Sequence, residues 1–177
     1  MNTKGFTLIE LLVVISIIGI ISAFVFVDYG KNDDTFSLER ASQKILQDIR
    51  LAQQKSLSGF EWEEETNAYG VYFSISNNNY FIYRNNNNNA NYYYDAEDTI
   101  VETIEIPDEM SIESILNNTD LVSSISISFV PPEPLTYIKN DSIGREAFIT
   151  LSLNENKTEK RTIKVNNSGR IEIKKNE

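Results

Sequence analysis

The sequence predicts an α+β fold, in which a long amino-terminal helix precedes a domain of antiparallel β-strands. Two observations carry this prediction. Between Phe36 and Gly59, apolar residues recur at spacings of three and four, which indicates an amphipathic helix. From Tyr69 onward the period falls to two, in short runs rich in Ile, Val, Tyr and Phe. Because no helical run separates these strands, we expect two small antiparallel sheets packed against the helix.

The composition excludes several classes of function. The chain has 177 residues, with no cysteine and no histidine. Disulfides, thiol nucleophiles, imidazole bases and the metal sites that need these groups are therefore excluded. The net charge of −10 argues against a nucleic-acid-binding surface, because phosphate contacts need positive charge. The basic residues near the carboxyl terminus are interpreted as solvated charge: Lys157, Lys160, Arg161, Lys174 and Lys175.

The amino-terminal segment has the length and the apolar character of a bilayer span. Glu10 is the only ionisable side chain between Phe6 and Val27, and a helix of that length covers about 33 Å. Lys4 supplies the basic start of a secretory signal, and Ser22-Ala23 is a weak cleavage region for one. Glu10 does not fit a plain signal, because an acid near the centre of a span costs on the order of 3 kcal/mol.

The stretch GFTLIE, from Gly5 to Glu10, with LLVVISIIGI after it, resembles the amino terminus of type IV prepilins and pseudopilins. The resemblance implies that a membrane peptidase cuts between Gly5 and Phe6 and methylates the new amine of Phe6. It also implies that the Glu10 carboxylate pairs with the Phe6 amine of a neighbouring subunit during fibre assembly. Pairing removes much of the cost of burying either charge alone, which accounts for an acid in an apolar run.

The flanking charges predict the orientation of this segment. Lys4 and the initiator amine precede it, whereas Asp28, Asp33 and Asp34 follow it against Lys31 alone. The positive-inside rule places the leader in the cytoplasm and the rest of the chain outside. We therefore expect a single-pass protein of the inner (cytoplasmic) membrane, and the resemblance implies that it later enters an extracytoplasmic fibre.

The helix is expected to consist of two parts. Residues 28–35 are polar and contain Gly30, which weakens a helix. Asp34 or Thr35 would cap the second part, and Gly59 would end it. The apolar stripe of this part, which we expect to pack on a sheet, consists of Leu38, Ala41, Ile45, Ile49 and Ala52.

These patterns divide the chain into four regions. They are a leader at 1–5, a membrane and assembly helix at 6–27, an amphipathic helix region at 28–59 and an extracytoplasmic β domain at 60–177. The predicted strands of the β domain are YGVYFSIS, YFIYR, TIVETIEI, SISISFV, REAFITLSL, RTIKV and GRIEIKK. The turn Asn166–Gly169 predicts a hairpin between the last two.

The order of the helix and the strands indicates which subfamily the chain resembles. A helix end RLAQQKSLSG, then antiparallel strands that finish with KVNNSGRIEI, is similar to the H-type minor pseudopilins of type II secretion and to the related minor pilins. The resemblance implies a pilin-like fold, with the helix packed on the β domain.

For two polar regions of the β domain, the favoured interpretation assigns no functional role. Asn85–Asn91, followed by Tyr92–Tyr94, is interpreted as a flexible loop, and the alternative is a tip loop that binds partners through exposed tyrosines. We expect no cofactor, because the chain has no EF-hand-like loop, and calcium stays open as the alternative, since some members of the family that the chain resembles bind it. The acidic clusters are interpreted as solvated surface: Glu61, Glu63, Glu64, Glu65, Asp95, Glu97 and Asp98.

We find no pattern for a catalytic site, since a phosphate-binding glycine loop is missing and no carboxylate pair stands out. The main hypothesis is a structural minor pseudopilin or minor pilin that is a substrate of prepilin peptidase and no enzyme. The resemblance implies as partners this peptidase, other pilin or pseudopilin subunits, an assembly ATPase, an inner-membrane assembly platform and membrane lipid. Protein secretion, pilus priming and DNA uptake stay open. The alternative is a membrane-anchored extracytoplasmic enzyme or binding module with a non-cleaved signal anchor.

Overall fold

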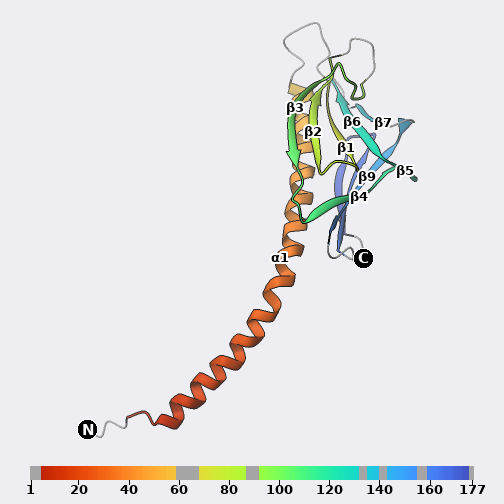
Figure 1. Cartoon of the computed structure of the whole chain (residues 1–177). Coiled ribbons are helices and arrows are strands. Elements are labelled where there is room, and N and C mark those ends of the chain that lie inside the picture. The colour runs from red at the N-terminus through yellow and green to blue at the C-terminus, as the bar shows by residue number, and fades with distance from the viewer. Residues whose placement is uncertain are drawn as a thin grey trace. The chain divides into compact units, whose positions relative to one another are not determined.

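The computed structural model describes residues 5–58, 68–86, 92–131, 135–139, 143–154 and 159–175. The chain forms two compact units, Met1–Ser37 and Leu38–Glu177. It is an α+β protein in which helix α1 is followed by two antiparallel sheets (Figure 1).

Helix α1 runs from Leu8 to Ser58. The predicted weakening at residues 28–35 is wrong, and Asp34 and Thr35 lie inside α1 and cap no second helix. A glycine in a helix interior costs about 1 kcal/mol, whereas a break would require a new and unfavourable nucleation. Continuing the helix is therefore favoured over ending it. Gly59, the predicted end, lies outside the described residues.

The strands form two sheets, here called sheet A and sheet B, in which every pair of neighbours is antiparallel. Sheet A has the order β3-β2-β1-β6-β7-β8 and sheet B the order β11-β10-β9-β4-β5. The strands of sheet A are β1 Tyr69–Ser74, β2 Asn79–Arg84, β3 Thr99–Glu105, β6 Ser124–Val130, β7 Leu135–Lys139 and β8 Ile143–Gly144. Those of sheet B are β4 Met110–Asn117, β5 Asp120–Val122, β9 Glu146–Leu153, β10 Lys160–Asn166 and β11 Ile171–Lys175.

Each of the seven predicted runs contains a strand, but β4, β5, β7 and β8 were missed. The cause is clearest in β4, whose pairing with β9 shifts between Ile112 and Ser114. This bulge changes the spacing of the buried residues from two (Met110 to Ile112) to three (Ile112 to Ile115), so the strand loses its period. Strands β5 and β8 have three and two residues, too few to show a pattern.

The predicted carboxyl-terminal hairpin is confirmed. Strands β10 and β11 pair from Arg161 with Lys175 to Val165 with Ile171. Gly169 has a φ of 76°, a conformation that favours glycine. The side-chain oxygen of Asn166 accepts the N–H groups of Ser168 and Arg170, at 3.1 and 2.9 Å. The turn residues thus supply both the backbone freedom and the hydrogen bonds that the hairpin needs.

The predicted helix stripe lies in the core. Leu38, Ile45, Ile49 and Ala52 are buried, and Ala41 is partly buried against the same cluster. They pack with apolar residues of both sheets, among them Val71, Phe73, Ile125, Ile149, Leu151 and Ile163. The half of α1 from Leu38 onward is therefore an integral part of the β domain.

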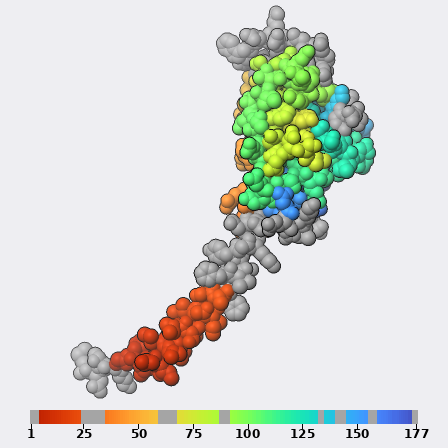
Figure 2. Space-filling view, in the orientation of Figure 1, coloured from red at the N-terminus to blue at the C-terminus, as the bar shows by residue number. Residues whose placement is uncertain are grey.

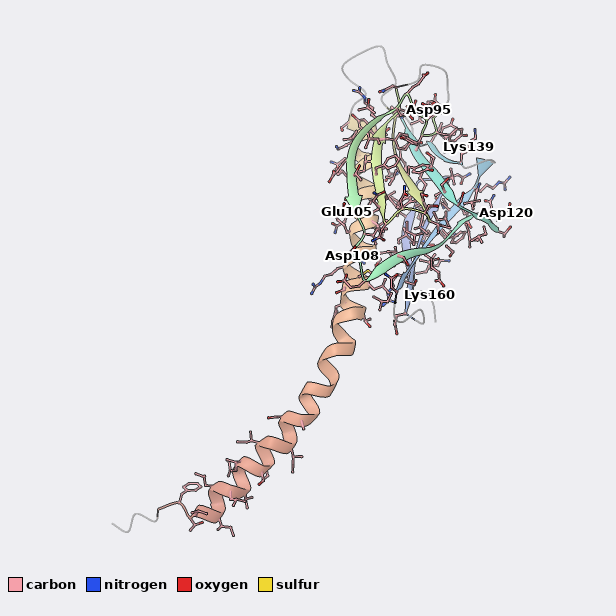
Figure 3. The ribbon with its side chains drawn as sticks, viewed as in Figure 1. Asp95, Glu105, Asp108, Asp120, Lys139 and Lys160 are labelled. Carbon is pink, nitrogen blue, oxygen red and sulfur yellow. The ribbon has the colours of Figure 1, made fainter. Side chains whose placement is uncertain are left out.

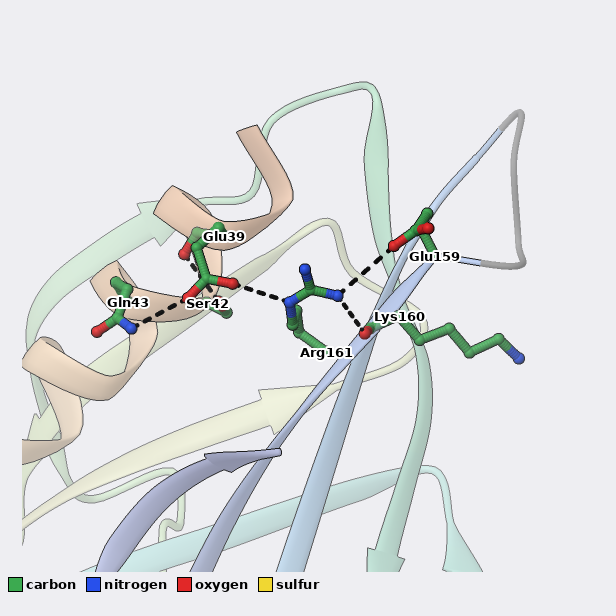
Figure 4. Close-up of polar contacts among 6 residues, drawn as sticks. All are labelled: Glu39, Ser42, Gln43, Glu159, Lys160 and Arg161. Carbon is green, nitrogen blue, oxygen red and sulfur yellow. Dashed lines mark hydrogen bonds and ion pairs between the residues drawn. The ribbon is translucent and has the colours of Figure 1, made fainter. Parts of the chain in front are cut away.

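A hydrogen bond and an ion pair also join α1 to the two sheets. Ser56 Oγ donates to the carbonyl of Phe129 on sheet A at 2.6 Å. On sheet B, Arg161 is almost fully buried, and its Nε lies 2.8 Å from Glu39 Oε2 on α1 (Figure 4). The same guanidinium donates to the Lys160 carbonyl at 2.9 Å. Helix α1 is thereby bonded to each sheet at a defined position.

Tyr92, Tyr93 and Tyr94 are half-buried and contact sheet A, which disfavours the alternative of a tip loop with exposed tyrosines. The Tyr94 ring lies 5.1 Å from Tyr72 and 4.7 Å from Phe81, centroid to centroid. Its backbone N–H donates to Ser126 Oγ at 3.0 Å. Aromatic neighbours on β1 and β2 thus offer Tyr94 a packing site that the local sequence could not indicate. Residues 87–91 lie outside the described part.

Candidate processing and assembly site

A capping box starts helix α1 at the predicted site. Thr7 immediately precedes Leu8, the first helical residue. Its hydroxyl accepts the Glu10 N–H at 3.3 Å, and the Glu10 carboxylate accepts the Thr7 N–H at 2.8 Å. This reciprocal pattern satisfies two backbone donors that a helix start leaves unpaired. Glu10 therefore has a local structural role as well as the assembly role implied by the resemblance.

The bonds to Glu10 are unevenly shared between its two oxygens. The backbone N–H and the hydroxyl of Thr7 both donate to Oε2, at 2.8 and 2.7 Å. Within the described residues, Oε1 accepts no hydrogen bond and meets no cation. The side chain is exposed. One oxygen thus holds the helix start, and among the described residues the other has no hydrogen-bond donor.

The residues around the predicted cleavage point are accessible. Phe6 is 84% exposed, and a Cβ added to Gly5 would have no neighbouring atom within 4 Å. Gly5 also lacks the positive φ that would demand glycine. The fold of the described residues therefore places no steric or backbone requirement for glycine at position 5.

The apolar side chains that follow Glu10 remain exposed to solvent when only the described residues are considered. Those between Leu11 and Ile21 remain about half exposed, and they lie on all sides of α1. Exposed apolar area on this scale needs burial by lipid or by other proteins. Within the described residues, no helix is both long and apolar enough to cross a bilayer.

The polar side chains of the β domain show no metal centre. No group of three or more carboxylates able to hold an ion occurs in the part of the chain that the structure describes. The Asp98 carboxylate accepts the N–H groups of Asn86 and Asp95, each at 3.0 Å, which suits a turn more than a cation. Burial raises the pKa of Asp98 although these donors oppose the shift. The cluster at 61–65 lies outside the described residues.

The structure brings Thr7 and Glu10 together at the start of α1, and Gly5 and Phe6 directly precede Thr7 in the chain. Thr7 was missed in the sequence. The signal for it was present, because Thr-x-x-Glu before an apolar run is the spacing of a capping box.

Comparison with known proteins agrees with this geometry. A family model described as the prokaryotic N-terminal methylation motif matches residues 1–26. No curated protein and no solved structure matches the chain. The matched residues include Gly5, Phe6, Thr7 and Glu10 and extend into the exposed apolar part of α1. The chain therefore carries the signal of a type IV prepilin-like precursor at its amino terminus.

Proposed function

We propose that the chain is a minor pseudopilin or minor pilin, most similar to the H type. Prepilin peptidase cuts it between Gly5 and Phe6 and methylates Phe6. The mature subunit then enters a type II secretion pseudopilus or a type IV pilus-like fibre, with an inner-membrane platform and other subunits as partners. The protein itself performs no chemistry in this role.

One observation carries the proposal: the Glu10 carboxylate at the start of α1, with one oxygen capping the helix and the other without a hydrogen-bond donor among the described residues. Removal of residues 1–5 leaves the Thr7–Glu10 bonds intact and creates a cationic amine on Phe6. In an apolar environment that amine and a neighbour's Glu10 are each costly alone, and pairing offsets much of the cost. The bond also fixes the axial position of one subunit against the next.

The exposed apolar side chains of α1 support the two-stage life of such a subunit. Before assembly, lipid would cover residues 6–27, with the leader in the cytoplasm and the β domain outside. After assembly, the equivalent residues of other subunits would cover them. The same surface serves both states, because lipid and packed helices are both apolar surroundings.

The β domain supports the narrower assignment to the H type. A helix that packs on two antiparallel sheets, with a final β10–β11 hairpin, has the element order that suggested this subfamily.

The experiment is an intact-mass measurement on the full-length protein purified from membranes of a host with active prepilin peptidase. The expected mass is that of residues 6–177 plus one methyl group, and peptide sequencing should place the methyl on the Phe6 amine. A host that lacks the peptidase is the control and should yield the unprocessed chain. An unprocessed chain from both hosts would contradict the proposal and favour a membrane-anchored enzyme or binding module.

A further inference from the structure

Sheet A ends in a long edge strand, β3. It has seven residues and pairs only with β2, whereas the other edge strands β8, β5 and β11 have two, three and five. Within the described residues, no backbone hydrogen bond joins the outer side of β3 to another segment. The backbone N–H and C=O groups on that side can therefore pair with a further strand.

Strand β3 is also exposed on both faces. Each of its residues is exposed except for Ile104, which is half-buried. Figure 2 shows the strand in green at the molecular surface. At Val101 the pairing with β2 skips one residue, and at this bulge Ile100 and Val101 keep 47% and 41% of their surfaces in solvent. The edge thus offers apolar contact as well as backbone groups.

The net charge of the chain arises in the segment that contains β3. Between residues 85 and 138 the sequence has ten acidic residues and no lysine or arginine. In the rest of the chain the acidic residues number 16, as many as the lysines and arginines. The whole net charge of −10 is therefore carried by this one segment.

The exposed acids of β3 and of the turn after it have no counter-ion in the part of the chain that the structure describes. Four exposed carboxylates form no ion pair there: Glu102, Glu105, Asp108 and Glu109. Figure 3 labels Glu105 and Asp108 at the end of β3 that leads to β4. A partner with positive charge would therefore be attracted to this edge.

A second copy of the chain is disfavoured as the partner. Pairing β3 with β3 would place Glu102 and Glu105 of one copy beside those of the other, and like charges on neighbouring strands repel. Charged side chains on an edge strand prevent self-association in this way. The same charges attract a cationic strand.

We propose that β3 receives an extended, cationic segment of a different protein, which adds to sheet A as a further strand. Lysines or arginines of that segment would lie near Glu102 and Glu105, and its β-branched residues would cover Ile100 and Val101. One such strand fills the edge and the contact ends there, which suits a subunit that lies among other proteins. The contact concerns the β domain alone and does not depend on cleavage of the leader.

A short synthetic peptide in which lysine alternates with valine and threonine is the probe. It is titrated into the detergent-solubilised full-length chain at low salt, and hydrogen exchange is measured strand by strand. We expect binding that slows the exchange of the β3 amides and leaves that of the β5 amides unchanged. The absence of binding, or binding that leaves exchange in β3 unchanged, would overturn strand addition.

A matched peptide separates backbone pairing from charge. N-methylation at alternate residues keeps the lysines but removes the N–H groups that would pair with β3. This peptide should bind about tenfold more weakly, because it loses several backbone hydrogen bonds. Equal affinities of the two peptides would show that charge alone attracts the probe, and would contradict the proposed strand.

Charge reversal on the protein locates the site. Glu102→Lys and Glu105→Lys should each weaken binding of the probe by about fivefold, the upper range for an exposed ion pair. The matched control is Asp120→Lys, at an exposed acid of β5 in the same acidic segment, and should bind as the unsubstituted chain does. An equal loss in the control would show that overall charge, and not β3, determines binding.

The intact mass of the same preparation reports cleavage of the leader separately. A processed chain that does not bind the probe at β3 overturns the strand addition alone. A chain that binds the probe at β3 but is never processed overturns the proposed function alone.

Discussion

The two units of the chain differ in whether their apolar side chains are buried. In Leu38–Glu177 the helix stripe and the inner faces of the sheets bury one another, and the largest core side chains are almost inaccessible to solvent. In Met1–Ser37 the described apolar side chains after Glu10 remain exposed. The hydrophobic effect stabilises the first unit from within, whereas the second depends on another molecule. Substitutions in the two units should therefore affect different measurements.

The largest expected effect is that of Gly5→Leu on processing. Because nothing lies within 4 Å of a Cβ at Gly5, the fold should tolerate leucine. Cleavage should be lost almost completely, since a peptidase that reads this position needs a small residue. The measurement is the proportion of processed chain in membranes. Gly19→Ala, also in open space, is the matched control and should be processed normally; processing of Gly5→Leu would contradict the assigned cleavage point.

The next effect is on stability, from Gly70→Ala in β1. An added Cβ would lie 2.5 Å from Cζ of Tyr83, whose ring is fully buried and whose hydroxyl bonds to Ser126 at 2.6 Å. We expect a loss of about 3 kcal/mol in the free energy of unfolding, the cost of overpacking a core. Denaturant unfolding of the detergent-solubilised chain measures it. Cleavage of the leader should be normal in this variant. A cleavage defect with an unchanged free energy of unfolding would contradict the view that substitutions in the two units affect different measurements.

A smaller loss is expected from Glu39→Gln. Arg161 is almost buried, and its Nε lies 2.8 Å from Glu39, which is 43% exposed. Loss of this charge-assisted bond should reduce the free energy of unfolding by about 1–2 kcal/mol, because Arg161 keeps its bond to the Lys160 carbonyl. Glu172→Gln removes an ion pair with the exposed Arg170 and should cost no more than about 0.5 kcal/mol. Equal losses in the free energy of unfolding of the two variants would contradict this expectation. They would show that the burial of Arg161 does not strengthen its bond to Glu39.

The smallest effect at neutral pH is that of tyrosine ionisation. Burial raises the pKa of Tyr80, which also donates to Asp48, and burial raises the pKa of Tyr83. Unfolded tyrosine has a pKa of about 10. Stability should therefore be constant with respect to these groups below that pH and fall above it, as the unfolded chain loses protons. Near-ultraviolet absorbance titration should show Tyr80 and Tyr83 ionising only with unfolding. A variant Tyr80→Phe that lowers the folded-state signal near pH 10 would contradict this.

Features that depend on local patterns were predictable from the sequence. The capping spacing, the helix stripe and the turn at Asn166–Gly169 are each set by neighbours in the chain. Contacts between distant residues could not be read in this way. The burial of Arg161 requires Glu39 from α1, and the packing of Tyr94 requires aromatic residues of two strands. Strand β4 escaped prediction because its bulge is defined by pairing with β9.

The candidate processing site is also read from a local pattern, and its cleavage stays a prediction. Gly5, Phe6 and Glu10 lie within six consecutive residues, so the motif is visible in the sequence without the fold.

The central claim is that the Glu10 carboxylate is neutralised by the terminal amine of a neighbouring subunit, just as the Phe6 amine would be by a neighbour's carboxylate. Zero-length carbodiimide cross-linking of isolated fibres tests it most directly. We predict an amide between Glu10 and the amino-terminal residue of a neighbouring subunit, found by mass spectrometry and absent from Glu10→Ala. Fibres in which Glu10 is never joined to an amino-terminal residue, while other carboxylates in the same sample react, would contradict it.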